Sequence, residues 1–179
     1  EDMRPMRELM QIIFQDPYSS LNPRIKVGGI IEEGLKSLKP DLNDKERKDK
    51  VSEVLRMVGL SSDMSNRYPH EFSGGQRSRI GIARVLVVEP ELIICDEATS
   101  ALDVSVQAQI LNLLRSVQIE FGLSYLFITH DLGIVEYMAD KVAVMYEGKV
   151  IEYGRTEEVL GRPKEEYTKK LLQAVPTID

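Results

Sequence analysis

The stretch EFSGGQRSRIGIARVLVVEPELIICDEATSALD, residues 71–103, decides the fold class of this chain. Its first part places a serine and two glycines directly before a segment whose apolar residues fall at helical intervals. Its second part is a short apolar run, Leu92 to Cys95, that ends in the carboxylates Asp96 and Glu97. An apolar run without alternation is typical of a parallel strand inside an α/β protein. The stretch therefore predicts a helix followed by a buried parallel strand.

Composition excludes several classes of protein. The chain has 179 residues, 42% of them hydrophobic, which is enough for one domain with a core and a subdomain. Its net charge of -6 is unfavourable for non-specific binding to phosphates, so no nucleic-acid partner is expected. No apolar run approaches the roughly 18 residues of a membrane span, and nothing resembles a signal peptide. The single cysteine, Cys95, excludes an internal disulfide. A chain without disulfides suits a reducing compartment, so a cytoplasmic location is expected.

Periodicity predicts the order of the remaining elements. Helices are expected over 27–38, 44–58, 76–87, 104–121 and 134–138, with a helical stripe at the C-terminus that includes Val175. Strands are expected over 10–14, 92–96 and 125–129, with a turn at Asp16 and Pro17 after the first, and a hairpin joins 141–146 to 149–153. Asp44 is expected to cap the second helix and Gly59 to end it. The strand 92–96, the helix 104–121 and the strand 125–129 together predict a parallel crossover unit.

The tetrad Ser73-Gly74-Gly75-Gln76 stands directly before a predicted helix. A hydroxyl, bare glycine backbone and unpaired amides at the positive end of a helix are suited to an anion such as phosphate. The alternative is a plain serine-capped helix. Both interpretations stay open from these four residues alone.

Two carboxylates and a histidine are expected at one edge of the predicted sheet. Asp96 and Glu97 end one buried strand, and His130 follows the next, where ligands bind in open α/β sheets. Asp96 is suited to hold Mg²⁺ through water, and Glu97 to accept a proton from an attacking water. The alternative is an acidic loop start with no ligand, because apolar strands often end in Asp or Glu.

These residues resemble, in order and spacing, the motifs of ABC ATPases. Phe72 to Gln76 resembles the signature motif, Leu92 to Glu97 the Walker B strand with its catalytic glutamate, and Ser100 to Asp103 the D-loop. His130 resembles the switch histidine and Gln15 the Q-loop glutamine. The resemblance implies that Glu97, His130 and Gln15 are catalytic, that Asp96 and Gln15 contact the metal, and that Ser73, Gly74, Gly75, Gln76 and Asp103 contact nucleotide. It implies an α/β, P-loop NTPase-like parallel sheet with an inserted helical subdomain.

Two further stretches narrow the resemblance. The stretches IIFQDPYSSLNPR, residues 12–24, and EEYTKKLLQAVP, residues 165–176, are similar to ATP-binding subunits of oligopeptide and dipeptide importers. Glu165 and Glu166 depart from the His-Pro pair common there. The resemblance implies ATP and Mg²⁺ as cofactors, a second ATPase subunit and transmembrane permease subunits as partners, and a peripheral position on the inner face of the cell membrane. No iron–sulfur cluster is expected, because the C-terminal part has no cysteine.

The pattern G-x-x-x-x-G-K-[ST], which grips phosphates, does not occur in these 179 residues; the only Gly-Lys pair, Gly148-Lys149, is followed by valine. We therefore expect an N-terminally truncated domain that is inactive alone. Losing three or four charge-assisted hydrogen bonds weakens ATP binding by about a thousandfold or more. Ser73, Gly75 and Asp103 are expected to act on the nucleotide of a partner subunit.

The motifs suggest four parts. They are the core strand and Q-loop (1–23), a helical subdomain with the signature (24–90), the catalytic core (91–154) and a C-terminal helical extension (155–179).

Loss of strands beside Leu92 to Cys95 is expected to expose an unpaired edge and to cause oligomerisation. Two alternatives remain: a cytosolic ABC ATPase of repair or translation, and a non-catalytic module in which 27–68 docks a membrane subunit.

Overall fold

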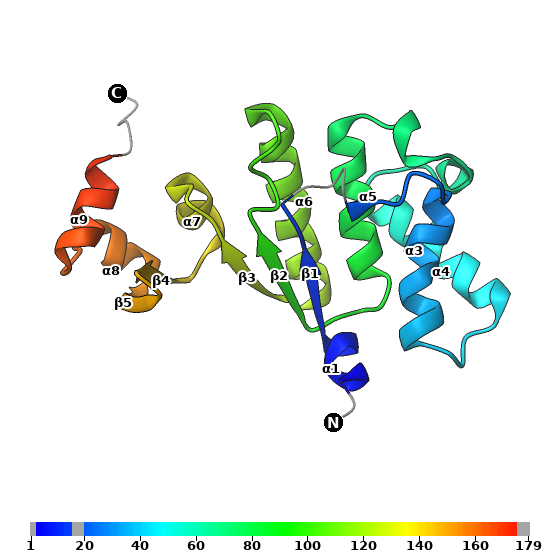
Figure 1. Ribbon diagram of the computed structural model, residues 1–179, viewed down its shortest axis with the longest axis horizontal. Helices are drawn as coiled ribbons and strands as arrows, with labels where there is room; N and C mark the ends of the chain where they lie inside the picture. Colours follow the sequence, from blue (N-terminus) through cyan, green and yellow to red (C-terminus); the bar gives the residue numbers. More distant parts are fainter. Residues whose placement is uncertain (1–2, 16–19, 175–179) are drawn as a thin grey trace. The chain divides into compact units, whose positions relative to one another are not determined.

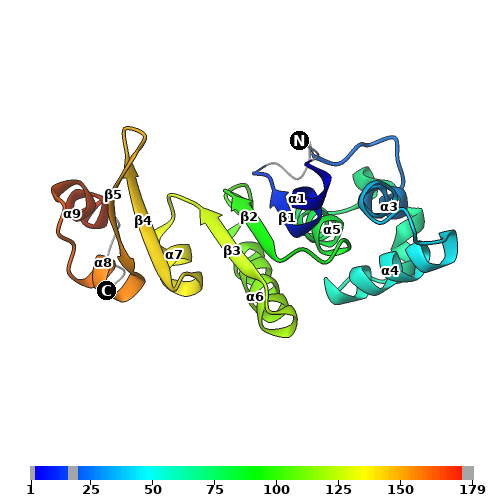
Figure 2. The ribbon, with the colours of Figure 1, turned by 90° about the horizontal axis from the view of Figure 1, so that it is seen from below.

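The computed structural model describes residues 3–15 and 20–174, so the turn expected at Asp16 and Pro17, and Val175, lie outside the described residues. The chain divides into two compact units, Glu1–Ile128 and Thr129–Asp179, which are described separately below. Figures 1 and 2 show their elements from two sides. The four parts suggested by the motifs stay a prediction.

A three-stranded parallel sheet forms the centre of the first unit (Figure 1). Its order is β1 (Met10–Ile13), β2 (Leu92–Asp96) and β3 (Ser124–Ile128), with Ile12 opposite Ile94 and Ile94 opposite Leu126. The predicted parallel crossover through α6 (Val104–Phe121) is confirmed. The expected unpaired edge along Leu92 to Cys95 is wrong, because β1 and β3 pair with the two edges of β2.

The two faces of this sheet differ in burial. Ile93 and Cys95 of β2 are fully buried, and burial raises the pKa of the Cys95 thiol to about 12, so this thiol is unreactive. On the opposite face, Leu126 and Ile128 of β3 remain about half exposed, at 51% and 50%. The continuous apolar run therefore lies on a sheet that is deeply buried on one face only.

Helices fill the chain between β1 and β2. After α1 (Arg4–Leu9), which precedes β1, they are α3 (Val27–Leu38), α4 (Asp44–Met57), the short 3₁₀ turns η1 (Ser62–Asn66) and η2 (Pro69–Glu71), and α5 (Gly74–Leu86). The apolar stripes that predicted α3 and α4 are buried, with Ile31, Leu35 and Leu55 fully inaccessible. Because these stripes pack together, the segment forms a small helical core of its own beside the sheet. Gly59, with φ +76°, follows the end of α4 as expected.

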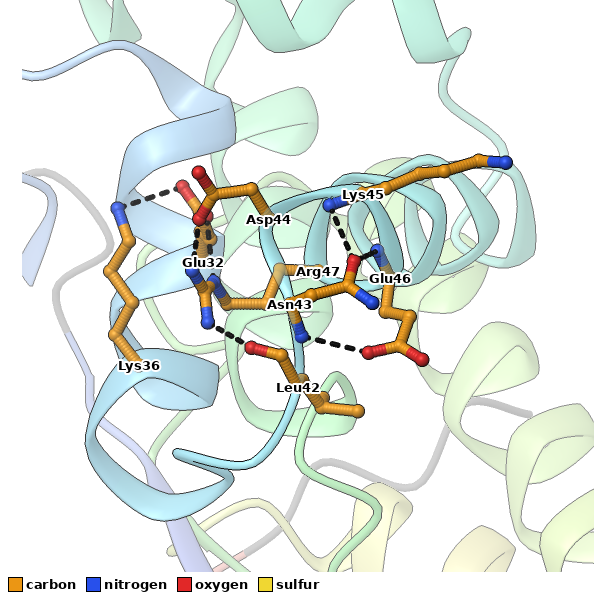
Figure 3. Close-up of polar contacts among 8 residues, drawn as sticks. All are labelled: Glu32, Lys36, Leu42, Asn43, Asp44, Lys45, Glu46 and Arg47. Atoms are coloured by element: carbon orange, nitrogen blue, oxygen red, sulfur yellow. Dashed lines mark hydrogen bonds and ion pairs between the residues drawn. The ribbon is translucent and has the colours of Figure 1, made fainter.

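Asn43, not Asp44, caps α4, which corrects the prediction. Its side-chain oxygen accepts hydrogen bonds from the backbone N–H groups of Lys45 and Glu46, both at 3.0 Å, and Glu46 returns a bond to the Asn43 N–H (Figure 3). Arg47 then joins α4 to α3, because its Nε lies 3.2 Å from Glu32. The cap therefore sets where α4 begins, and the ion pair links the start of α4 to α3.

Replacing Asn43 with alanine is expected to destabilise the first unit by about 1 kcal/mol, because two backbone N–H groups lose their acceptor. Urea unfolding followed by circular dichroism measures the change. Lys45→Ala is the matched control, since the Lys45 side chain points away from the cap in Figure 3. Equal stability of the two variants would contradict the assigned cap.

Up to Ala174, the second unit joins a hairpin to three helices. It contains α7 (Leu132–Met138), β4 (Lys141–Tyr146), β5 (Lys149–Arg155), α8 (Thr156–Gly161) and α9 (Glu166–Gln173). The predicted hairpin is confirmed, and its two-residue turn has φ values of +48° at Glu147 and +76° at Gly148. Positive φ at both positions is the turn geometry that matches the twist of a hairpin.

A carboxylate of β5 holds the chain that enters α9. Glu152 accepts hydrogen bonds from the backbone N–H groups of Lys164 at 2.9 Å and Glu165 at 3.2 Å. The hydrogen bond from the Lys164 N–H is the main cause that lowers the pKa of Glu152 from its usual 4.5. Glu152 therefore acts as a remote cap for the N-terminus of α9.

The stabilising effect of Glu152 is expected to be fully present above about pH 4.5 and to fade as the pH falls further. The reason is that the folded pKa lies below the unfolded one, so the unfolded chain takes up the proton first. Hydrogen exchange at the Lys164 and Glu165 amides, measured from pH 6 down to pH 3 and corrected for intrinsic rates, tests this expectation. Glu152→Gln should flatten the pH dependence; an unchanged profile would exclude the remote cap.

No helix in residues 3–15 and 20–174 combines the length and the apolarity needed to cross a membrane.

Candidate functional site

Two residues far apart in sequence meet at the carboxyl edge of the sheet. Gln15 follows β1 and Glu97 follows β2, and the Gln15 Nε2 donates a hydrogen bond of 2.7 Å to the Glu97 Oε2 across 82 positions. The same Nε2 lies 3.4 Å from the Ser100 Oγ. The structure thus brings together two of the residues assigned to catalysis from the sequence.

The backbone of Glu97 is held in an uncommon conformation. Its φ is +46°, in the left-handed region that residues with a side chain rarely adopt. Its N–H donates to the Ile128 carbonyl at 2.9 Å, and its carbonyl accepts from both the N–H and the hydroxyl of Ser100 at 3.0 Å. Ser100 lies at the start of the stretch that resembles the D-loop, but the sequence indicates no role for it. The contacts make Ser100 a positioning residue for Glu97.

Asp96 is the last residue of β2 and lies half-buried opposite Ile128 in β3. Its carboxylate and the amide oxygen of Gln15 are hard donors of the kind that Mg²⁺ prefers. In the part of the chain that the structure describes, no three His, Cys, Asp or Glu side chains gather as a metal-binding group. A Mg²⁺ ion bound here would take its remaining ligands from water and phosphate, as this ion commonly does. The residues present fit such an ion.

Ser73 caps α5, so the plain capped helix weighed from the sequence is present. Its hydroxyl accepts a hydrogen bond from the Gln76 N–H at 3.3 Å, and the Gln76 side chain accepts from the Ser73 N–H at 3.0 Å. A phosphate at this helix end is limited to the remaining first-turn N–H groups, those of Gly74 and Gly75, unless it opens the cap. The cap and an anion site are compatible.

Gly75 is required for the close approach of α6 to α5. A Cβ built on it would lie 2.7 Å from the Val106 Cγ1, closer than such atoms approach. The neighbouring Asp103 caps α6, accepting from the Val106 N–H at 2.9 Å and the Ser105 hydroxyl at 2.7 Å, and the Val106 bond is the main cause of its lowered pKa. The start of the signature helix and the end of the D-loop therefore form one continuous surface.

His130 lies in the second unit, two residues after the end of β3. Asp131 beside it caps α7, accepting from the Gly133 N–H at 2.9 Å. The proximity of His130 to Glu97 stays a prediction.

A parallel sheet with a helical insertion, and a glutamine–glutamate contact at its carboxyl edge, place the chain among the open α/β proteins that bind ligands at this edge. Residues 1–100 match the model of the ABC transporter family, and the chain belongs to this family.

Curated relatives agree with this assignment. The chain is 56% identical over 170 residues to the oligopeptide transport ATP-binding protein OppF of Bacillus subtilis, covering 95% of this chain and 56% of that protein. It is 53% identical over 172 residues to the dipeptide transport ATP-binding protein DppF of Haemophilus influenzae, covering 96% and 52%. The chain therefore spans about half the length of the curated relatives it matches. The likeness to importer ATP-binding proteins that two stretches of sequence indicated is confirmed.

Solved structures confirm the fold class. CbiO1 of Clostridium perfringens, described as part of the ABC transporter complex cbiONQ, aligns with a TM-score of 0.78 at 34% identity over 97% of this chain and 67% of that one. The ATP-binding cassette MJ0796, a dimer bound to ADP and phosphate, aligns with a TM-score of 0.72 at 26% identity over 86% and 66%.

Proposed function

We propose that this chain is the hydrolytic part of an ATP-binding subunit of an importer for oligopeptides or dipeptides. The observation that carries the proposal is the contact between Gln15 and Glu97 at the carboxyl edge of a parallel sheet, where ligands bind in such folds. Identities of 56% and 53% to an oligopeptide and a dipeptide transport ATP-binding protein support the substrate class.

In this proposal each residue assigned from the motifs has a distinct task. Glu97 accepts a proton from the attacking water, and Gln15 orients that water and the metal. Asp96 holds Mg²⁺ through water, and His130 contacts the terminal phosphate. A Mg²⁺ ion held there would neutralise charge on the phosphates. Ser100 keeps the Glu97 backbone in place through its two hydrogen bonds.

The surface formed by the signature and the D-loop serves a second ATPase subunit. Ser73, Gly74, Gly75 and Gln76 present a helix end to the phosphate of a nucleotide held by that subunit, and Asp103 holds the start of α6 against them. Closure of the pair drives transmembrane permease subunits, and the complex lies on the inner, cytoplasmic face of the membrane. The family match and the dimeric form of MJ0796 support this arrangement.

The 179 residues contain no G-x-x-x-x-G-K-[ST], the pattern whose backbone and lysine grip phosphates. We therefore expect the chain on its own to release no phosphate from ATP. A sensitive phosphate-release assay on the purified chain tests this point, and turnover that depends on Glu97 would contradict it.

A chimera tests the function directly. The matching 170-residue segment of Bacillus subtilis OppF is replaced by this chain, and the chimera is expressed in cells that lack that subunit. Restored uptake of a labelled oligopeptide supports the proposal. Failure of a chimera that is stably expressed and binds ATP would exclude the oligopeptide assignment.

A further inference from the structure

An open groove of about 540 Å³ lies at the edge of the sheet opposite Gln15 and Glu97, entirely within the first unit. It is bordered by the residues that lead into β2 and β3, among them Glu91 and Ser124. In Figure 1 the starts of these strands lie at the lower side of the sheet. Its volume falls in the range of small-molecule sites. Nothing in the proposed function uses this groove.

Three helix C-termini line the groove. Met57 is the last residue of α4, Leu86 the last of α5 and Phe121 the last of α6, and all three contribute to the lining. Each helix has 13 or more residues, and the C-terminus of such a helix carries a partial negative charge. The convergence of these ends contributes a negative potential to the groove, partly offset at α4, where the Arg79 guanidinium donates a hydrogen bond of 2.7 Å to the Val58 carbonyl.

The side chains on the rim add to this potential. Glu53, Glu89 and Glu91 lie on the rim together with one cation, Lys50, which forms an ion pair with Glu89. Within residues 3–15 and 20–174, neither Glu53 nor Glu91 forms an ion pair with another residue. A net charge of about -2 therefore faces the groove from side chains, in addition to the helix ends.

The floor of the groove is apolar. It is formed by the half-exposed ring of Phe121, by Met57 and by the nearly buried Leu123 and Val54. Methionine and phenylalanine side chains adapt to flat apolar groups, and the ring of Phe121 also attracts cations through its face. Apolar floor and negative rim together favour a ligand that is apolar at one end and positively charged at the other.

We propose that this groove binds a small organic cation, namely an ammonium or guanidinium group attached to an aromatic or aliphatic body. The apolar body lies against Phe121 and Met57, and the cation lies between Glu53 and Glu91. An anionic ligand of the same shape is repelled by the carboxylates and by the helix ends. The proposal concerns binding only and does not depend on ATP hydrolysis.

Two probes of opposite charge test the proposal. The purified chain, with ¹³C-labelled methionine methyl groups, is titrated with phenylbutylammonium and separately with phenylbutyrate. The ammonium is expected to shift the Met57 methyl signal with a dissociation constant of about 1 mM, which is typical of a ligand of this size. Its affinity is expected to fall at high salt, because salt screens the charges. The carboxylate is expected to leave Met57 unshifted.

Variants assign the effect to the groove. Glu53→Gln/Glu91→Gln is expected to weaken ammonium binding at least about fivefold, because two surface charge pairs are lost, and Phe121→Ala should weaken it as well. Glu136→Gln, an exposed carboxylate of α7 in the other unit, is the matched control and should bind unchanged. Equal binding of both probes, an unchanged affinity in the double variant, or shifts confined to other methionines such as Met10 would each overturn the proposal.

Discussion

Glu97→Gln in the OppF chimera is expected to lower ATP hydrolysis by about 10²- to 10⁴-fold, the usual contribution of a general base. Glutamine has almost the same volume as glutamate, and its side-chain oxygen still accepts the hydrogen bond from Gln15. The substitution therefore removes proton acceptance while keeping the contact that positions the side chain. Phosphate release under saturating ATP measures the loss, and ATP binding measured separately should persist.

Three further variants separate proton transfer from positioning. Ser100→Ala removes one of two bonds to the Glu97 carbonyl and should lower turnover less than Glu97→Gln does. Gln15→Ala should also lower turnover, because the carboxylate loses its partner. Glu136→Gln should leave turnover unchanged. Full turnover in Glu97→Gln would show that Glu97 is not the general base. This conclusion would hold even if the unsubstituted chimera restores peptide uptake, because uptake tests the transport assignment and not the identity of the base.

Elements with a long apolar stripe could be predicted from the sequence almost to the residue. The helices expected over 27–38 and 104–121 have those bounds in the structure, because a stripe that packs on a core continues as long as the helix does. The predicted bounds of the strand 92–96 also agree with the structure, since turn residues flank it on both sides. Glu97, the proposed general base, could be placed at the strand end for the same reason.

Features set by side chains from distant segments could not be predicted. Asn43 and Asp44 are both good caps, and the choice between them depends on how α4 meets α3 through Arg47. The central position of β2 depends on the pairing of strands that are distant in sequence, and local periodicity carries no information about that pairing. Ser100 and Glu152 act on backbone groups, and a sequence pattern does not show where those groups lie.

Gly75 illustrates how one motif residue has two interpretations. From the sequence, Gly75 lets a phosphate approach the helix backbone closely. In the structure, the Val106 side chain approaches this backbone closely. Both need a residue without a Cβ, so the motif alone does not separate them. The packing contact exists in the chain without any ligand, and its energetic effect can be measured by unfolding alone.

Gly75→Ala is expected to destabilise the first unit by about 1 to 3 kcal/mol, because its Cβ would force the start of α6 away from α5. Gly81→Ala, in the same helix, is the matched control: nothing lies within 4 Å of its added Cβ, so it should stabilise the unit by about 0.5 to 1 kcal/mol. Urea unfolding measures the free energy of unfolding of both variants, which is expected to fall for Gly75→Ala and to rise for Gly81→Ala. If Gly75→Ala is as stable as Gly81→Ala, the contact with Val106 does not constrain Gly75, and the phosphate remains the only physical reason for a glycine there.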